Sequence, residues 1–235
     1  MNVLTIDAAT GTEIVAVDAS GFVSDKTAPT SASHSVTLFN NIDAALREAG
    51  ITEKDLDLLG VGAGPGSFTG LRIAVATARM LAQVLEIPLV PLDSPLIYAA
   101  SLTSMEGDII LSAFDAKKGR VFGALYRKTS GHLELETIVP PGDYPIDALL
   151  EGYDGKGKLL VAGYGIEKYS GKIHAASPDC DIPAEVRPSG AVACALARRA
   201  FEKNPGAYHN YDEVTPRYAR KSDAEVMLEL RKKPT

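Results

Sequence analysis

The sequence predicts an α/β protein of two lobes, each of which begins with a meander of three strands. Six short apolar or β-branched runs, in two sets of three, are separated by turn-forming residues, as is typical of antiparallel meanders. After each set, helical and strand patterns alternate. A polar stretch at residues 101–108 marks the boundary between a lobe of residues 1–104 and a lobe of residues 105–221. The six runs occupy residues 3–7, 13–18, 22–26, 109–114, 120–126 and 132–139.

The composition is that of an ordinary globular protein. The 235 residues are 46% hydrophobic and 23% charged, and the net charge of −6 makes the chain a poor stand-alone binder of nucleic acid. The first residues lack the basic and apolar segments of a signal peptide. Arg72 and Arg79 interrupt the longest apolar run, so we expect no membrane span. The two cysteines imply no disulfide framework, and we expect a reduced, cytoplasmic protein.

The first lobe continues with an amphipathic helix and with the most apolar helix of the chain. Apolar residues recur at three- and four-residue steps from Val36 to Ala49, and Gly50 ends that pattern. Thr52 and Asp55 match a capping box. A strand at 58–61 leads through a glycine-rich turn into a helix ending near residue 85. A strand at 88–92 and a short helix at 94–100, capped by Ser94, complete the lobe.

The second lobe repeats this order with shorter elements. A loop at residues 115–119 joins its first two strands into a hairpin. Ser189 caps a clear helix at 191–201. Ser222 and Glu225 match a capping box for a C-terminal helix, within residues 222–235, that can pack back on the first lobe. Further elements are expected at 145–150 (helix), 159–162 (strand) and 215–219 (strand).

The glycine-rich turn at residues 62–70 admits three interpretations. Glycines before a helix let a phosphate approach backbone amides, but Leu71 and Arg72 follow Gly70 where a Walker loop has Lys and Ser or Thr. Gly64, Gly66 and Gly70 form only a loose dinucleotide fingerprint. The third interpretation is structural, with Ser67 or Thr69 as the N-cap of a helix that is buried or meets a partner.

Asp7 is the one acidic residue at the end of a predicted first strand. It could serve metal or phosphate chemistry, or it could stabilise the turn that follows. The four histidines, His34, His132, His174 and His209, include no pair one helical turn apart, so we expect no metal site.

Five short motifs, in order, resemble the TsaB (YeaZ) family over nearly the whole chain. The block from Gly64 through Pro65, Gly66, Ser67, Phe68, Thr69 and Gly70 to Arg72 is the most specific of them. The resemblance implies the duplicated fold of the actin, Hsp70 and sugar-kinase (ASKHA) superfamily, with ribonuclease-H-like lobes. The other motifs are Ile6-Asp7-Ala8-Ala9-Thr10, Ser33-His34, residues 115–122 and Pro216-Arg217-Tyr218.

The resemblance also implies a function. TsaB is the non-catalytic partner of TsaD in forming N6-threonylcarbamoyladenosine (t6A) at position 37 of tRNAs that read ANN codons, and TsaE joins the pair. The family forms homodimers when alone, and it meets tRNA through the complex. We therefore expect no enzymatic activity and no cofactor. Weak nucleotide binding at a subunit junction stays open. Ala9 replaces the glycine of the superfamily's phosphate turn beside Asp7, and Gly163-Tyr164-Gly165 is too short to restore the adenosine turn.

The resemblance places the partner interface on the two helices of the first lobe. Small residues at four-residue spacing on the second helix would allow close helix approach, while Ile73, Met80 and Val84 fill another face. On this hypothesis Ala74→Arg or Ala78→Arg abolishes pairing. The expected interface residues are Val36, Phe39, Gly70, Ile73, Ala74, Thr77, Ala78 and Leu81.

Two other functions stay open on sequence grounds. One is a stand-alone kinase- or peptidase-like ASKHA enzyme that uses Asp7. The other is an NADP-dependent oxidoreductase built on Gly64, Gly66 and Gly70, with Asp93 as the ribose partner. The oxidoreductase would need the strand before the glycines to open a parallel Rossmann unit, but a meander precedes it.

Overall fold

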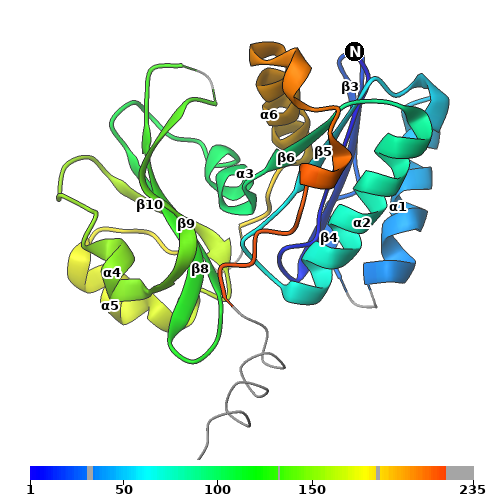
Figure 1. Cartoon of the computed structure of the whole chain (residues 1–235). Helices are drawn as coiled ribbons and strands as arrows, with labels where there is room; N and C mark the ends of the chain where they lie inside the picture. Colours follow the sequence, from blue (N-terminus) through cyan, green and yellow to red (C-terminus); the bar gives the residue numbers. More distant parts are fainter. Residues whose placement is uncertain (31–33, 132, 184–185, 221–235) are drawn as a thin grey trace, which may run out of the picture.

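The structure, a computed structural model, describes residues 1–30, 34–131, 133–183 and 186–220, with the backbone alone for residues 34–36. Its two sheets form two lobes (Figure 1). In the first sheet the strand order is β3-β2-β1-β5-β6, and β4 pairs with β2. These strands are β1 (Val3–Asp7), β2 (Thr12–Ala19), β3 (Phe22–Asp25), β4 (Ala28–Pro29), β5 (Leu58–Gly62) and β6 (Leu89–Leu92).

The second sheet repeats the topology of the first with four strands in place of six, in the order β10-β7-β8-β9. In each sheet an antiparallel meander is followed by a strand that pairs in parallel with the first strand of that meander, β5 with β1 and β10 with β7. This repeat confirms the predicted duplicated α/β fold. The strands are β7 (Ile109–Asp115), β8 (Arg120–Lys128), β9 (Leu135–Pro145) and β10 (Leu159–Tyr164).

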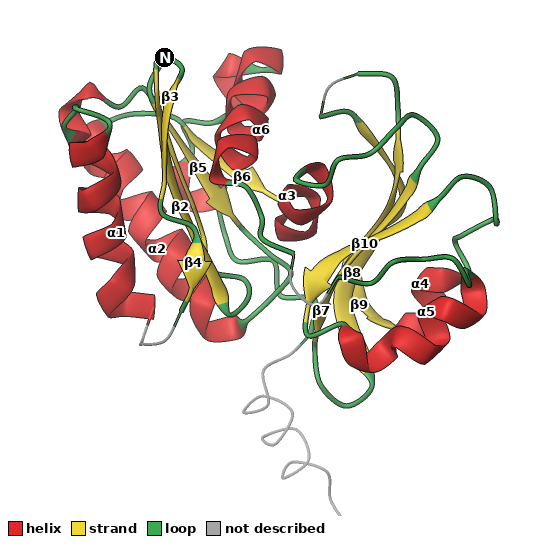
Figure 2. Ribbon diagram, turned by 180° about the vertical axis from the view of Figure 1, so that it is seen from behind, coloured by secondary structure: helices red, strands yellow, loops and turns green. Residues whose placement is uncertain are grey.

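Helices cover both faces of the first sheet (Figure 2). α1 (His34–Glu48) and α2 (Phe68–Leu85) lie on one face, and α6 (Gly190–Lys203) lies on the other, against β1, β2 and β5. The predicted boundary at residue 104 assigns α6 to the second lobe, so this assignment is corrected: the chain returns to the first sheet after Ser189. The remaining helices are α3 (Ser94–Ala100), α4 (Ile146–Leu150), α5 (Ser170–Ala176) and the short 3-10 turns η1 (Glu53–Asp55), η2 (Glu167–Tyr169), η3 (Pro205–Ala207) and η4 (Tyr211–Glu213).

The local signals for helix starts that fall within the described residues are confirmed with one exception. The Ser67 and Ser189 side chains accept from Gly70 N and Val192 N, and the Asp55 carboxylate accepts from Thr52 N at 2.9 Å. The exception is α3, whose N-cap is Asp93.

Two of the predicted strands need correction, and one predicted helix is not described. The third strand of the second lobe begins at Leu135 and extends to Pro145, and its pairing with β8 shifts register on both sides of Leu125. No strand forms at residues 215–219, where the described chain follows an irregular path along the first lobe. The predicted helix at 223–230 lies outside the described residues.

Among the described residues, α2 alone has the length and composition of a membrane-spanning helix, and it meets no further criterion of one. One face of α2 nevertheless packs on β5 and β1. Its residues Leu71, Val75 and Ala82 are buried there. A helix that covers a sheet can have the same apolar composition as a membrane-spanning helix, so composition alone does not distinguish the two.

A shared core joins the lobes at α3. Its buried residues run from Val3 and Leu58 of the first sheet to Ile110 and Ala162 of the second. Tyr98 of α3 contacts Phe114 edge-on, with ring centres 4.7 Å apart, and its hydroxyl forms a 2.7 Å hydrogen bond with the Thr10 hydroxyl. Tyr98 therefore ties the β1–β2 turn to the second lobe.

Removing the Tyr98 hydroxyl is expected to weaken this contact. Tyr98→Phe leaves the buried Thr10 hydroxyl with one bond fewer, so the free energy of unfolding in urea should fall by about 1 kcal/mol. Tyr126→Phe is the matched control, because the Tyr126 hydroxyl is buried without a hydrogen bond to the described residues. Its removal should leave stability unchanged or raise it. Equal losses in the two variants would contradict the role given to the Tyr98–Thr10 bond.

Candidate functional site

The candidate site is the glycine-rich turn between β5 and α2, together with the segments that contact it. A Cβ on Gly66 would lie 2.4 Å from the Ala9 carbonyl oxygen, and a Cβ on Gly70 would lie 1.8 Å from that of Ala8. Ser67 N donates to the same Ala9 oxygen at 2.7 Å. The glycines are therefore required because the turn packs directly against the backbone that follows β1.

Asp7 lies beneath this contact and is 2% exposed. Its carboxylate accepts from Ala9 N at 2.6 Å, and a Cβ on Gly62 would lie 1.8 Å from its second oxygen. The geometry is that of an aspartate that stabilises the turn after its own strand. The carboxylate therefore has almost no contact with solvent, from which a metal or phosphate would have to approach.

The C-terminal motif lies against the glycine-rich turn, although well over a hundred residues separate them in the sequence. Arg217 N donates to the Ala63 carbonyl at 2.7 Å. The Tyr218 ring stacks on Phe68, with centres 4.7 Å apart. The Arg72 guanidinium lies 3.9 Å from the centre of the Phe68 ring, and its Nε donates to the Tyr218 hydroxyl at 2.8 Å. Residues 214–220, named here the strap, thus join two motifs that the sequence shows only separately.

The motif at residues 115–122 forms the β7–β8 hairpin of the second lobe. Asp115 accepts from Lys117 N at 2.9 Å and forms a 2.5 Å ion pair with Lys168. Partial burial acts to raise the pKa of Asp115, but the bonds from Lys168 and Lys117 outweigh it and leave that pKa below its ordinary value. Arg120 pairs with Asp143 at 2.9 Å, which fixes the hairpin to β9.

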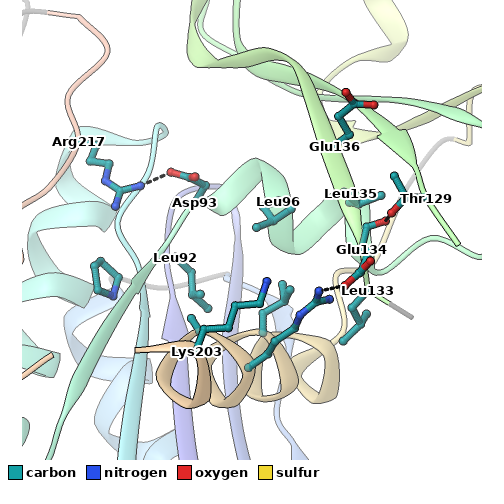
Figure 3. Close-up of a pocket in the computed structure, with 14 residues that line it drawn as sticks. Leu92, Asp93, Leu96, Thr129, Leu133, Glu134, Leu135, Glu136, Lys203 and Arg217 are labelled. Atoms are coloured by element: carbon teal, nitrogen blue, oxygen red, sulfur yellow. Dashed lines mark hydrogen bonds and ion pairs between the residues drawn. The ribbon is translucent and has the colours of Figure 1, made fainter. Parts of the chain in front are cut away.

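Two cavities flank the ion pair between Asp93 and Arg217. The larger, of about 520 Å³, lies between α6, the end of β6 and the β8–β9 hairpin, and a second ion pair, Arg199 with Glu134, also bounds it (Figure 3). The smaller, of about 380 Å³, adjoins the strap and is named here the strap pocket. Its walls are Pro65, Asp93, Pro141, Gly142, Asp143, Arg217, Tyr218 and Ala219.

The position of the superfamily's phosphate turn is contacted by the second lobe. A Cβ on Gly11, in the β1–β2 turn, would lie 2.2 Å from the Tyr164 hydroxyl. Gly163 is required by strand pairing, because its Cβ would lie 2.1 Å from the Ala113 carbonyl, and Gly165 adopts a positive φ of 66°. The Gly163-Tyr164-Gly165 segment is thus explained by the fold without an adenosine ligand.

The glycine turn does not open a Rossmann unit. β5 is reached only after an antiparallel meander, and it lies between β1 and β6 inside the sheet. Asp93, the expected ribose partner, pairs with Arg217. These observations remove the structural basis of the NADP hypothesis.

No cluster of three metal-ligating side chains occurs among the described residues. His174 Nε2 lies 3.0 Å from the Cys180 carbonyl oxygen, and His209 is exposed. The side chains of His34 and His132 lie outside the described part of the chain.

The expected interface residues divide between the two sides of the helix layer. Phe39 is 48% exposed, and Ile73 and Leu81 are partly exposed. In contrast, Gly70, Ala74, Thr77 and Ala78 are buried within the chain, so their small size serves the packing of α2 on its own sheet. The side chain of Val36 lies outside the described residues. The exposed apolar face of the layer consists instead of Phe39, Ile73, Met80 (47% exposed) and Val84 (75% exposed), named here the outer face.

Sequence reasoning found the motifs but not the contacts between them. No sequence pattern indicates that Tyr164 contacts Gly11, and no sequence pattern indicates that Asp93 pairs with Arg217. Such contacts depend on how the lobes meet. A local sequence pattern does not encode that geometry.

The known proteins that resemble this chain carry names from one tRNA modification, threonylcarbamoylation of adenosine. A family model described as "TsaD: tRNA N6-adenosine threonylcarbamoyltransferase" matches residues 26–176. Among curated proteins, the chain is 36% identical over 107 residues to the "tRNA threonylcarbamoyladenosine biosynthesis protein TsaB" of Bacillus subtilis (strain 168). This alignment covers 46% of the present chain and 45% of the Bacillus protein. It is 30% identical over 146 residues to the protein of the same name from Escherichia coli (strain K12), covering 60% and 63%. The two matches thus span 45% and 63% of these relatives' lengths.

Solved structures show the same fold. "YeaZ from Pseudomonas aeruginosa" superposes with a TM-score of 0.77 at 22% identity, covering 92% of this chain and 99% of that one. A second structure, described as similar to peptidase YEAZ from the same organism, gives a TM-score of 0.79 at 23% identity, covering 93% and 99%. At this identity the likeness concerns the fold alone.

Proposed function

We infer the function from one premise: the chain belongs to the family described as TsaD, tRNA N6-adenosine threonylcarbamoyltransferase, and within it to the TsaB (YeaZ) proteins. We propose that it is a subunit required to form t6A at position 37 of tRNAs that read ANN codons. The match of residues 26–176 to the family model, together with the two relatives named for this biosynthesis, carries the proposal.

The subunit is proposed to be non-catalytic. Its phosphate-turn position carries Ala9, whose carbonyl oxygen is bound by Ser67 N, and the neighbouring Gly11 is covered by Tyr164. A phosphate would have to displace both contacts. Asp7, the candidate acid, is buried under the glycine-rich turn. These features favour a chain that supports another subunit's chemistry over one that binds and hydrolyses ATP itself.

The proposed partners are a TsaD protein, joined by TsaE, and a second copy of this chain when it is alone. The outer face supports this assignment because it presents Phe39, Met80 and Val84 to solvent on two adjacent helices. Exposed apolar side chains of this size on neighbouring helices suit a helix-pair partner, which would complete a four-helix interface.

Reconstituted tRNA modification tests the proposal. TsaD, TsaE, an enzyme that generates threonylcarbamoyl-adenylate, ATP and unmodified tRNA are combined with and without this chain. We expect t6A only when the chain is present, and no ATP hydrolysis by the chain alone. Equal t6A with and without it would refute the proposal, and ATPase activity of the purified chain would refute its non-catalytic part.

A further inference from the structure

The lining of the strap pocket suits a flat, neutral ring. Pro65, Pro141 and Gly142 give it apolar surface without long flexible side chains. Its two carboxylates are each neutralised by an arginine, Asp93 by Arg217 and Asp143 by Arg120. The pocket therefore offers polar atoms at its edge without excess charge, as a nucleobase requires of its binding site.

An aromatic ring with an accessible surface adjoins this pocket. Tyr218 lines the pocket and is 42% exposed, while Phe68 stacks on its ring and Arg72 binds its hydroxyl. Proteins bind the bases of single-stranded RNA by stacking them on aromatic rings and arginine planes. The Arg72 and Phe68 contacts hold Tyr218 in place before any ligand arrives, which lowers the entropy lost on binding.

The strap that borders the pocket is positively charged, although the pocket lining also holds Asp93 and Asp143. The chain carries a net charge of −6, whereas the strap contains Arg217 and Arg220 and no acidic residue. Among the described residues neither Arg72 nor Arg220 takes part in an ion pair; Arg72 binds Tyr218, and Arg220 lies 5.6 Å from the centre of the Phe122 ring. Two guanidinium groups beside the pocket thus remain available to phosphates.

We propose that the strap pocket binds one unstacked base of a single-stranded RNA segment, with Arg72 and Arg220 contacting the flanking phosphates. The inference rests on the proposed function, which makes tRNA the RNA concerned. Because one base and two phosphates give little affinity, the site acts as an auxiliary contact that orients tRNA on the assembled complex.

Binding of unmodified tRNA to the chain mixed with TsaD tests the proposal. Tyr218→Ala is expected to weaken binding about tenfold through the lost stacking. Arg72→Gln and Arg220→Gln should weaken it less and should each reduce the slope of log affinity against log salt by about one. Arg127→Gln is the matched control, since it removes a partly exposed arginine, paired with Asp154, from the far end of β8 and should change neither quantity.

Ultraviolet crosslinking of tRNA to the wild-type complex provides a readout independent of folding. We expect crosslinked peptides that contain Tyr218 or Phe68. Crosslinks confined to other peptides, or a Tyr218→Ala variant that binds tRNA normally, would overturn the proposal. So would a Tyr218→Ala variant that loses TsaD rather than tRNA, because the strap would then be a protein contact.

The two proposals fail in different ways. If wild-type chain supports t6A formation but the strap variants bind tRNA normally, the RNA site is wrong and the function stands. If the chain is dispensable for t6A while Tyr218 still crosslinks to tRNA, the site stands and the proposed function is wrong.

Discussion

Gly70→Ala is expected to destabilise the protein by about 2–3 kcal/mol, although alanine is the better helix former. A Cβ at this position would lie 1.8 Å from the Ala8 carbonyl oxygen, which is a backbone atom and cannot rotate away. Either α2 or the turn after β1 must move, and each is packed into the first-lobe core. The free energy of unfolding, measured in urea by circular dichroism, gives the size of the loss.

Gly171→Ala provides the control for helix propensity. Gly171 lies in α5, and a Cβ there would meet nothing within 4 Å. This substitution should stabilise the chain by about 0.5 kcal/mol, because it removes only the flexibility of glycine. If both substitutions stabilise the protein, the glycine-rich turn does not require the close backbone contact described here.

Met80→Glu is expected to abolish pairing with TsaD while the chain remains folded. Met80 is 47% exposed on the outer face, so the monomer tolerates a charge there. In the complex the carboxylate would be buried without a partner, at a cost of about 3–5 kcal/mol, or at least about a hundredfold in affinity. Titration calorimetry with purified TsaD measures this loss, and circular dichroism checks the fold.

Met105→Glu makes the same chemical change on another surface. Met105 is 75% exposed in the loop between α3 and β7, away from α1 and α2, and its substitution should leave pairing unchanged. Normal pairing of Met80→Glu would exclude the outer face as the interface. Ala74→Arg and Ala78→Arg, which the sequence suggests for this test, are less suitable because both positions are fully buried in the chain's own core and a charge there would impair folding.

The sequence predicts those parts of the fold that depend on neighbouring residues. Short apolar or β-branched runs between turn-forming residues located both meanders, and serines before apolar runs located the caps at Ser67 and Ser189, because these signals act within a few residues. The return of α6 to the first sheet was not predictable, since its apolar stripe fits either lobe. Only tertiary contacts assign it to β1, β2 and β5.

The candidate site was predictable in its residues and not in its geometry. Four-residue spacing of small side chains on α2 identifies a closely packed face, but it does not tell whether the neighbour is the chain's own backbone or a partner. The Ala8 oxygen beside Gly70 answers that question for the inner face. The stack of Tyr218 on Phe68 likewise joins motifs whose separation hides their contact from any local pattern.

The most direct test of the central claim, that this chain acts only by assembling with TsaD, is a titration of reconstituted tRNA modification. The rate of t6A formation is measured at fixed TsaD, TsaE, ATP and tRNA while the concentration of the chain is raised. The account predicts a rate that rises from near zero and saturates when chain and TsaD are equimolar, with no t6A at any chain concentration when TsaD is omitted. Modification by the chain without TsaD, or a full rate before any chain is added, would contradict it.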